Sequence, residues 1–215
     1  MDHLSRSCAA LAAAQLLLSA FFTAQPLQAE SDAPIHYYDA AIGKTGPALK
    51  AALQSIIRNH TVIPYTAATT DTWDALKVLD QDPLDADSVL LIYSGLTALK
   101  SEQYTGSVGT WEREHLWPQS YGITALSSSS RAMKDLFNLR PIDRNVNGSR
   151  GNKFYDISTA PFSMHPEASG STYDSNSWEA RAADKGAIAR SMFYMAVRYD
   201  GSDSDVPDLE LSDSP

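Results

Sequence analysis

The sequence is short of cysteine, and this restricts the kinds of site that it can build. The only cysteine among the 215 residues is Cys8, which lies in an N-terminal segment that we expect to be removed. The mature chain would then have neither a disulfide nor a thiolate metal site. Any metal ion must be bound by oxygen and imidazole ligands. This favours a hard cation such as Mg²⁺, with Ca²⁺ or Mn²⁺ as alternatives.

Long apolar runs are also scarce, and the longest lies at the N-terminus. Residues 8–22 are mainly alanine and leucine, Arg6 precedes them, and Ala29 is a small residue before a polar stretch. This order is typical of a secretory signal peptide, and the run is short for a membrane span, which needs about 20 residues. We therefore predict a signal peptide at residues 1–29 and a secreted or periplasmic protein with no membrane contact after cleavage.

Basic residues are outnumbered, and the formal net charge is −9. Because phosphate binding needs a cationic surface, this total argues against a nucleic-acid partner. The distribution of charge along the chain, by contrast, favours a nucleic-acid partner. Residues 111–155 hold seven basic and four acidic residues, whereas residues 200–215 hold six acidic residues and no basic one. A basic patch on an acidic body suits a protein that acts on nucleic acid without adhering to it everywhere. We expect the acidic segment 200–215 to be flexible.

Two hydrolase signatures are absent from the sequence. It has no H-E-x-x-H pattern of zinc proteases and no G-x-S-x-G pattern of serine esterases. With no cysteine left in the mature chain, a thiol protease is excluded as well. The sequence therefore gives no support to the hypothesis of a protease or an esterase.

Hydrophobic periodicity and turn residues predict the elements outside the central stretch. Apolar residues at helical spacing predict three helices, and a continuous apolar run predicts a buried strand. The helices are expected after Thr45-Gly46-Pro47, at Thr72–Leu79, and at Lys185–Tyr199 with Asp184 as its cap; the strand is Val89–Tyr93. An acidic loop is expected at Asp80–Asp87 and an irregular region at Tyr155–Ser177.

The central stretch, Trp111–Tyr155, carries most of the chemistry. We expect a strand that ends at Glu114-His115, a loop, a second strand over Leu136–Ile142, and a helix capped by Asp143. Adjacent residues of a strand point to opposite faces. Glu114 and His115 can therefore share one site only at a strand end, which the break at Trp117-Pro118 provides.

The residue types in this stretch suit hydrolysis of a phosphodiester. A neutral imidazole such as His115 can take a proton from water. A neighbouring carboxylate and an amide oxygen from a helix can hold Mg²⁺, which also accepts waters and phosphate oxygens. Arginine side chains bind phosphate through paired donors. A base, a metal site and a phosphate clamp are together the groups that metal-assisted hydrolysis needs.

The full pattern REHLWPQSYG…DLFNLRPIDRNVNGSRGNKFYD resembles the secreted bacterial endonuclease I family, nucleases of the His-Me finger (ββα-metal) class. The resemblance continues upstream in YYDAAIGKTGPALKAALQSII and downstream in KGAIARSMFYMAVRYDG, and it covers nearly all the mature chain. It implies an α+β fold with a ββα-metal core and flanking helices, in one nuclease domain over residues 30–199. It also implies cleavage of DNA, and often of RNA, with little sequence preference. We expect a monomer.

The same resemblance assigns roles to individual residues. It implies His115 as the general base, and Glu114 and Asn147 as the protein ligands of a single Mg²⁺. It makes Arg150 and Arg140 candidates to bind the scissile phosphate or its neighbour.

Two of these assignments have alternatives. Asn145 or Asn152 could be the amide ligand in place of Asn147. Arg150 could instead have a structural role, in which it pins the glycine-containing turn by bonding carbonyl oxygens.

The chain also departs from the family at its C-terminal end. The family continues past the acidic segment into a further helix and an Arg/Asn-rich stretch, whereas this sequence stops at Pro215. We therefore expect a chain truncated at its C-terminus. Two hypotheses compete with an active nuclease. The protein could be a non-catalytic extracellular cation-binding module, or it could be an inactive truncated relative of the nucleases.

Overall fold

The structure is a computed structural model, and it describes residues 33–106, 109–123, 130–203 and 208–212. The chain divides into two units, Met1–Ile35 and His36–Pro215. The signal peptide predicted at residues 1–29 lies outside the described residues. Everything that follows concerns the second unit.

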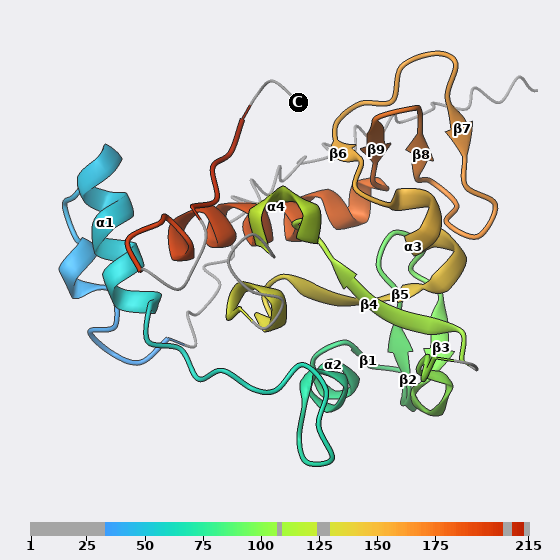
Figure 1. Cartoon of the computed structure of the whole chain (residues 1–215), viewed down its shortest axis with the longest axis horizontal. Coiled ribbons are helices and arrows are strands. Elements are labelled where there is room, and N and C mark those ends of the chain that lie inside the picture. Colours follow the sequence, from blue (N-terminus) through green and yellow to red (C-terminus); the bar gives the residue numbers. More distant parts are fainter. Residues whose placement is uncertain (1–32, 107–108, 124–129, 204–207, 213–215) are drawn as a thin grey trace, which may run out of the picture. The chain divides into compact units, whose positions relative to one another are not determined.

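The described residues of the second unit form an α+β structure in which short strands make three separate sheets (Figure 1). The α-helices are α1 (Gly46–Ile57), α2 (Thr72–Leu79), α3 (Arg144–Arg150) and α4 (Ala182–Arg198). The strands are β1 (Gln81–Asp82), β2 (Asp85–Leu90), β3 (Thr97–Leu99), β4 (Trp111–His115), β5 (Leu139–Asp143), β6 (Phe154–Tyr155), β7 (Ser163–Met164), β8 (Thr172–Tyr173) and β9 (Ser177–Glu179). The sheet orders are β1-β2-β3, β4-β5 and β6-β9-β8-β7. Short helical turns are η1 (Asp39–Ala41), η2 (Lys100–Glu102), η3 (Gln119–Ile123) and η4 (Ala132–Lys134).

The predicted helices are confirmed, although one cap differs. Helix α1 begins at Gly46 with a proline in its first turn, where the missing N–H costs nothing. Helix α2 is capped by Asp71, whose carboxylate accepts from the main-chain N–H groups of Trp73 and Asp74. Helix α4 is preceded by Arg181 as its cap residue, and the Arg181 side chain makes no capping hydrogen bond. The Asp184 carboxylate instead binds Arg181 and the main-chain N–H of Tyr93.

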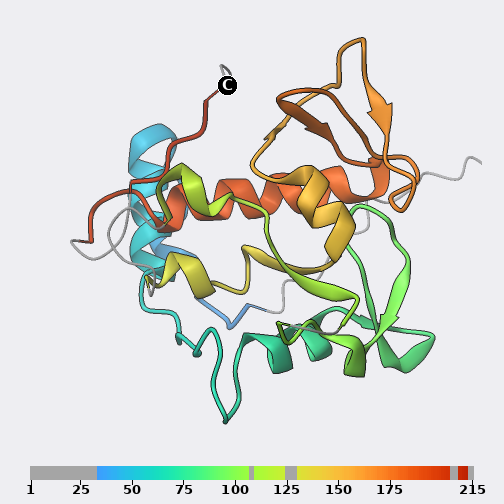
Figure 2. The same ribbon diagram turned by 45° about the vertical axis from the view of Figure 1, so that its right-hand side comes forward.

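Helix α4 is the longest element of the unit, and other elements pack around it. Both views show α1 beside the C-terminal end of α4 and the β6–β9 sheet near its N-terminal end (Figures 1 and 2). The α1 contact extends past the helix end, because Gln54 Nε2 donates to Ser202 Oγ at 2.9 Å. Arg58 of the same region pairs with Asp203. Helix α4 thus ties the start of the unit to its last described residues.

Within the part of the chain that the structure describes, three clusters of buried hydrophobic residues form the core. The first cluster includes Tyr93, Ile142, Trp178 and Ile188. The second cluster includes Ile123, Met195, Tyr199 and Leu209. The third cluster includes Trp73, Val89 and Trp111. The chain crosses between two of them directly after β4. Leu116 belongs to the first cluster and Trp117 to the second. Their main-chain N–H groups both bind Asn138, one at its carbonyl and one at its side-chain Oδ1.

Several expectations outside the central stretch were wrong. The acidic segment Asp80–Asp87 forms the β1–β2 hairpin rather than a loop. The apolar run Val89–Tyr93 leaves the sheet at Leu90, and Tyr93 has a φ of 68°. The region Tyr155–Ser177 contributes strands to the four-stranded sheet. Short paired strands of two or three residues carry little periodic signal, so sequence pattern alone misses them.

The described residues beyond position 199 differ from the flexible segment that their composition suggests. Asp203 is buried and pairs with Arg198, whose side chain is also buried. Leu209 is buried in the second cluster, and its N–H donates to the carbonyl of Tyr199 at 2.7 Å. Across the described residues, no helix combines the length and the apolar character needed to cross a membrane.

Candidate active site

A two-stranded antiparallel ladder followed by a short helix supports the candidate site. Strands β4 and β5 pair from Trp111 opposite Asp143 to His115 opposite Leu139. The chain then enters α3, where the Asp143 carboxylate accepts from the N–H groups of Asn145 and Val146 at 2.7 and 3.1 Å. This cap is the one that the sequence predicts. It fixes α3 against the ladder and places its polar side chains near the end of β4.

A cleft of about 270 Å³ opens at that end of β4. Four of the five residues proposed from sequence line it, namely Glu114, His115, Asn147 and Arg150. His115 is the last residue of β4, so the strand end lets two adjacent side chains reach one cleft, as expected. Arg140 is not among the lining residues. Its guanidinium donates to the carbonyls of Leu136 and Leu139 and lies 3.8 Å from Asp80.

His115 is held as a neutral imidazole with a defined tautomer. It is 5% exposed, and Nε2 lies 2.8 Å from the carbonyl oxygen of Met133, to which only an N–H can donate. Nδ1 is therefore the acceptor, and the Gln119 amide donates to it at 3.0 Å. Burial lowers the pKa of His115 to about 4, partly offset by the Met133 carbonyl. At neutral pH, Nδ1 is thus unprotonated and accepts the hydrogen bond from Gln119.

Glu114 is buried, with a tyrosine and an arginine beside it. Its side chain is 2% exposed, and Oε1 accepts from the Tyr93 hydroxyl at 2.7 Å. Arg150 Nε lies 3.3 Å from the same oxygen. Burial raises the pKa of Glu114, while Arg150 acts in the opposite direction. Tyr93 reaches this position from a left-handed backbone conformation that is costly for a bulky residue, and strain of this kind concentrates at functional sites.

Asn147 is oriented by an acidic neighbour on the strand. Its amide nitrogen donates to Glu112 Oε1 at 2.7 Å, so its carbonyl oxygen Oδ1 is the atom that can act as a ligand. Glu112 and Glu114 alternate on β4 and therefore share a face of the ladder. Of the two alternatives to Asn147, Asn152 also lines the cleft, whereas Asn145 donates to Glu167 instead.

The donor set of the cleft fits a hard divalent cation. Glu114 supplies a carboxylate and Asn147 an amide oxygen, both from the walls of one cleft. Mg²⁺ is commonly held by one or two protein oxygens and completes its shell with waters and substrate phosphate oxygens. Within the described ranges, no group of three or more His, Cys, Asp or Glu residues could hold a metal ion.

Arg150 is a wall of the cleft rather than a surface cation. It is 1% exposed, and its guanidinium donates to the carbonyls of Leu116 and Gly151 at 2.8 and 3.0 Å. It also lies over the Tyr155 ring, 4.8 Å from the centroid. These contacts favour the structural alternative, in which Arg150 pins the turn after α3. Direct binding of phosphate by Arg150 stays a prediction.

Sequence reasoning missed three residues of the site: Tyr93, Glu112 and Gln119. Glu112 could have been found, because it stands two residues before Glu114 on the same strand face. Gln119 lies four residues after His115, just past the predicted break. Tyr93 has no local signal, since its contact with Glu114 spans 21 positions of the chain.

A family model and two curated relatives match the chain. A family model described as Endonuclease I matches residues 45–209. A protein of Bacillus amyloliquefaciens named extracellular ribonuclease is 45% identical over 177 residues, which are 82% of this chain and 57% of that relative. A protein of the same name from Bacillus subtilis (strain 168) is 42% identical over 177 residues, 82% of this chain and 58% of the relative. The chain thus spans somewhat more than half the length of these relatives. No solved structure matches it.

Proposed function

Because the chain belongs to the endonuclease I family, we propose that it is a secreted, Mg²⁺-dependent endonuclease that hydrolyses phosphodiester bonds of nucleic acids. The observation that carries this proposal is the buried neutral His115, which lines the same cleft as Glu114 and Asn147. Secretion is supported by the signal-like residues 1–29 and by relatives named as extracellular proteins. The β4-β5-α3 arrangement is the proposed ββα-metal core.

In the proposed mechanism, His115 is the general base. In the resting site the Gln119 amide donates to Nδ1. When water replaces this amide, Nδ1 takes a proton from the water as the water oxygen attacks phosphorus and the bond to the leaving oxygen breaks. The Met133 carbonyl holds the Nε2 proton and stabilises the imidazolium that forms. The chemistry that Mg²⁺ supplies when bound by Glu114 and Asn147 is the stabilisation of negative charge on the phosphate and on the leaving oxygen. Arg150 keeps the cleft wall rigid through its carbonyl contacts.

The proposed substrates are DNA and RNA together. The resemblance found in the sequence implies DNA, whereas both curated relatives are named ribonucleases. A mechanism in which His115 activates water makes no use of the ribose 2′-hydroxyl. It therefore applies to either sugar.

The test is cleavage by the full-length chain. We expect plasmid DNA and a structureless RNA to be cut with Mg²⁺ and left intact with EDTA. His115→Ala is expected to lower the rate about 10²–10⁴-fold, the usual contribution of a positioned base. His36→Ala is the matched control, because His36 is an exposed histidine whose ring bonds only Asp39 among the described contacts. Unchanged activity in His115→Ala would sink the mechanism.

A further inference from the structure

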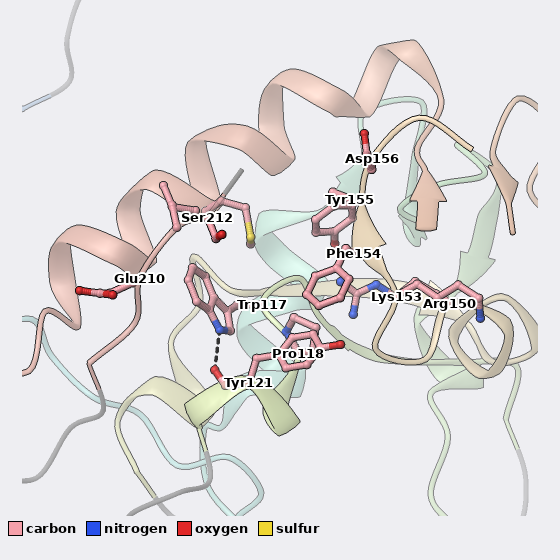
Figure 3. Close-up of a pocket in the computed structure, with 12 residues that line it drawn as sticks. Trp117, Pro118, Tyr121, Arg150, Lys153, Phe154, Tyr155, Asp156, Glu210 and Ser212 are labelled. Carbon is pink, nitrogen blue, oxygen red and sulfur yellow. Dashed lines mark hydrogen bonds between the residues drawn. The ribbon is translucent and has the colours of Figure 1, made fainter. Parts of the chain in front are cut away.

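A second cavity of about 400 Å³ adjoins the candidate active site (Figure 3). It shares two lining residues, Pro118 and Arg150, with the cleft that contains His115. Its size lies within the range of about 300–1,000 Å³ that small-molecule sites occupy. None of the roles assigned so far uses this cavity.

Aromatic rings dominate one side of the cavity. Tyr121 and Phe154 are stacked, with ring centroids 5.0 Å apart and ring planes inclined by 3°. Both side chains are half-buried, and Figure 3 shows them beneath helix α4 together with Trp117. The Trp117 indole donates to the carbonyl of Tyr121 at 2.8 Å and so fixes the turn that carries this ring. Rigid aromatic faces of this kind are the surfaces on which proteins stack nucleobases.

The charges around the cavity suit a ring better than a phosphate. The Arg150 guanidinium is engaged by main-chain carbonyls and Glu114. The Lys153 ammonium donates to the carbonyl of Ser149 at 2.7 Å. Two carboxylate residues, Asp156 and Glu210, line the cavity and are exposed. Carboxylates repel phosphate, whereas they accept hydrogen bonds from the amino groups of bases.

Resting on the nuclease function proposed above, we propose that this cavity is a base pocket. The nucleobase of a nucleotide adjacent to the scissile phosphate extends the stack that Tyr121 and Phe154 form with each other. The two hollows share a wall, so a strand whose phosphate lies in the cleft can place a neighbouring base in the base pocket. Stacking accepts every base, because each has a π face. The base pocket therefore supplies affinity and position without strict sequence preference.

The first experiment maps cleavage along an end-labelled single-stranded oligonucleotide that contains one abasic site. Wild type is expected to cut the linkages next to the abasic site about 5- to 140-fold less often than the other linkages. This range corresponds to the loss of one stacked base. Because each band is compared with other bands of the same lane, overall activity does not enter. Uniform cutting through the abasic region by wild type would overturn the proposal.

Variants that remove a ring but keep apolar volume sharpen this test. Phe154→Leu, and separately Tyr121→Leu, are expected to abolish the dip at the abasic site and to raise the KM for intact oligonucleotide. Phe137→Leu is the matched control, because Phe137 also stacks on a tyrosine, Tyr194, with centroids 4.2 Å apart, but does not line the base pocket. A dip that persists in both pocket variants, with native circular dichroism, would also overturn the proposal. The second variant keeps the test valid if one variant fails to fold.

A binding measurement separates failure of this proposal from failure of the proposed function. Adenosine and guanosine monophosphates are titrated in EDTA by isothermal calorimetry, with ribose 5-phosphate as the probe that lacks a base. Binding of the nucleotides alone, lost in Phe154→Leu, supports the base pocket even if no cleavage is found. The opposite result is cleavage that depends on His115 together with either equal binding of all the probes or binding of none. That result refutes the base pocket and leaves the nuclease function supported.

Discussion

Replacement of Arg150 by methionine separates its two possible roles. The guanidinium is 1% exposed, lies 3.3 Å from Glu114, and donates to the carbonyls of Leu116 and Gly151. Methionine has similar length but no charge, so Arg150→Met leaves a carboxylate buried without its partner. Removal of one member of a buried ion pair costs about 3–5 kcal/mol. Domains of this kind have a total stability of about 5–15 kcal/mol, so the loss is large but measurable.

The assay is urea unfolding followed by circular dichroism in EDTA, which prevents metal binding from compensating. We expect the free energy of unfolding to fall by about 3–5 kcal/mol in Arg150→Met. The double variant Glu114→Gln/Arg150→Met should recover part of this loss, because it also removes the orphaned charge. Arg190→Met, at an exposed arginine of α4, is the control and should change stability by less than about 0.5 kcal/mol. If Arg150→Met were as stable as this control yet bound nucleic acid poorly, Arg150 would be a phosphate ligand and the structural reasoning would be refuted.

Three further predictions concern pH and backbone conformation. Burial raises the pKa of Asp80 from 3.8 to about 6, so the folded state retains a proton that the unfolded state has lost, and stability falls as pH rises through this window. Asp80→Asn should therefore gain up to about 3 kcal/mol at pH 7.5 and nothing near pH 3.5 in urea unfolding; a pH-independent gain would contradict this cause. Burial lowers the pKa of His115 to about 4. The value of kcat/KM should therefore stay level down to about pH 5 and decline only as the pH approaches 4. A decline centred near pH 6.5 would instead show that the imidazole is solvated. Gly109 has a φ of 117°, and a Cβ there would lie 2.5 Å from the carbonyl oxygen of Gln103. Gly109→Ala should therefore lower the free energy of unfolding by more than about 1 kcal/mol in thermal or urea unfolding. Gly148→Ala in helix α3 is the control and should not destabilise the protein, because a Cβ at Gly148 meets nothing within 4 Å.

The sequence predicts the local elements of the site well, because their signals are local. Asp143 stands directly before the helix that it caps, and its geometry needs only the next three residues. The end of β4 follows from Trp117-Pro118, and the two neighbouring side chains Glu114 and His115 then reach one cleft. The family resemblance adds Asn147, which the structure brings to the same cleft. The roles of these residues remain predictions that the assays above test.

The environment of the site could not be predicted, because it depends on contacts between distant parts of the chain. Tyr93 was expected at the end of a strand, yet its φ of 68° turns it toward Glu114. The sequence leaves Arg150 open to phosphate binding or to a structural role, and its burial in the structure favours the second. The acidic residues after position 199 suggested a solvated tail, but Leu209 is buried against α4 residues, which composition does not reveal.

The division of Leu116 and Trp117 between two core clusters makes the register of β4 a condition for folding. A slip of β4 by one residue along β5 would turn every β4 side chain to the opposite face of the ladder. Leu116 would then point towards the cluster that contains Trp117, and His115 would move away from the Met133 carbonyl. Both clusters can therefore close only after β4 and β5 have paired correctly. We expect the amide protons of this ladder to exchange with solvent only on global unfolding. The geometry of the cleft and the cooperativity of the fold would then be lost together.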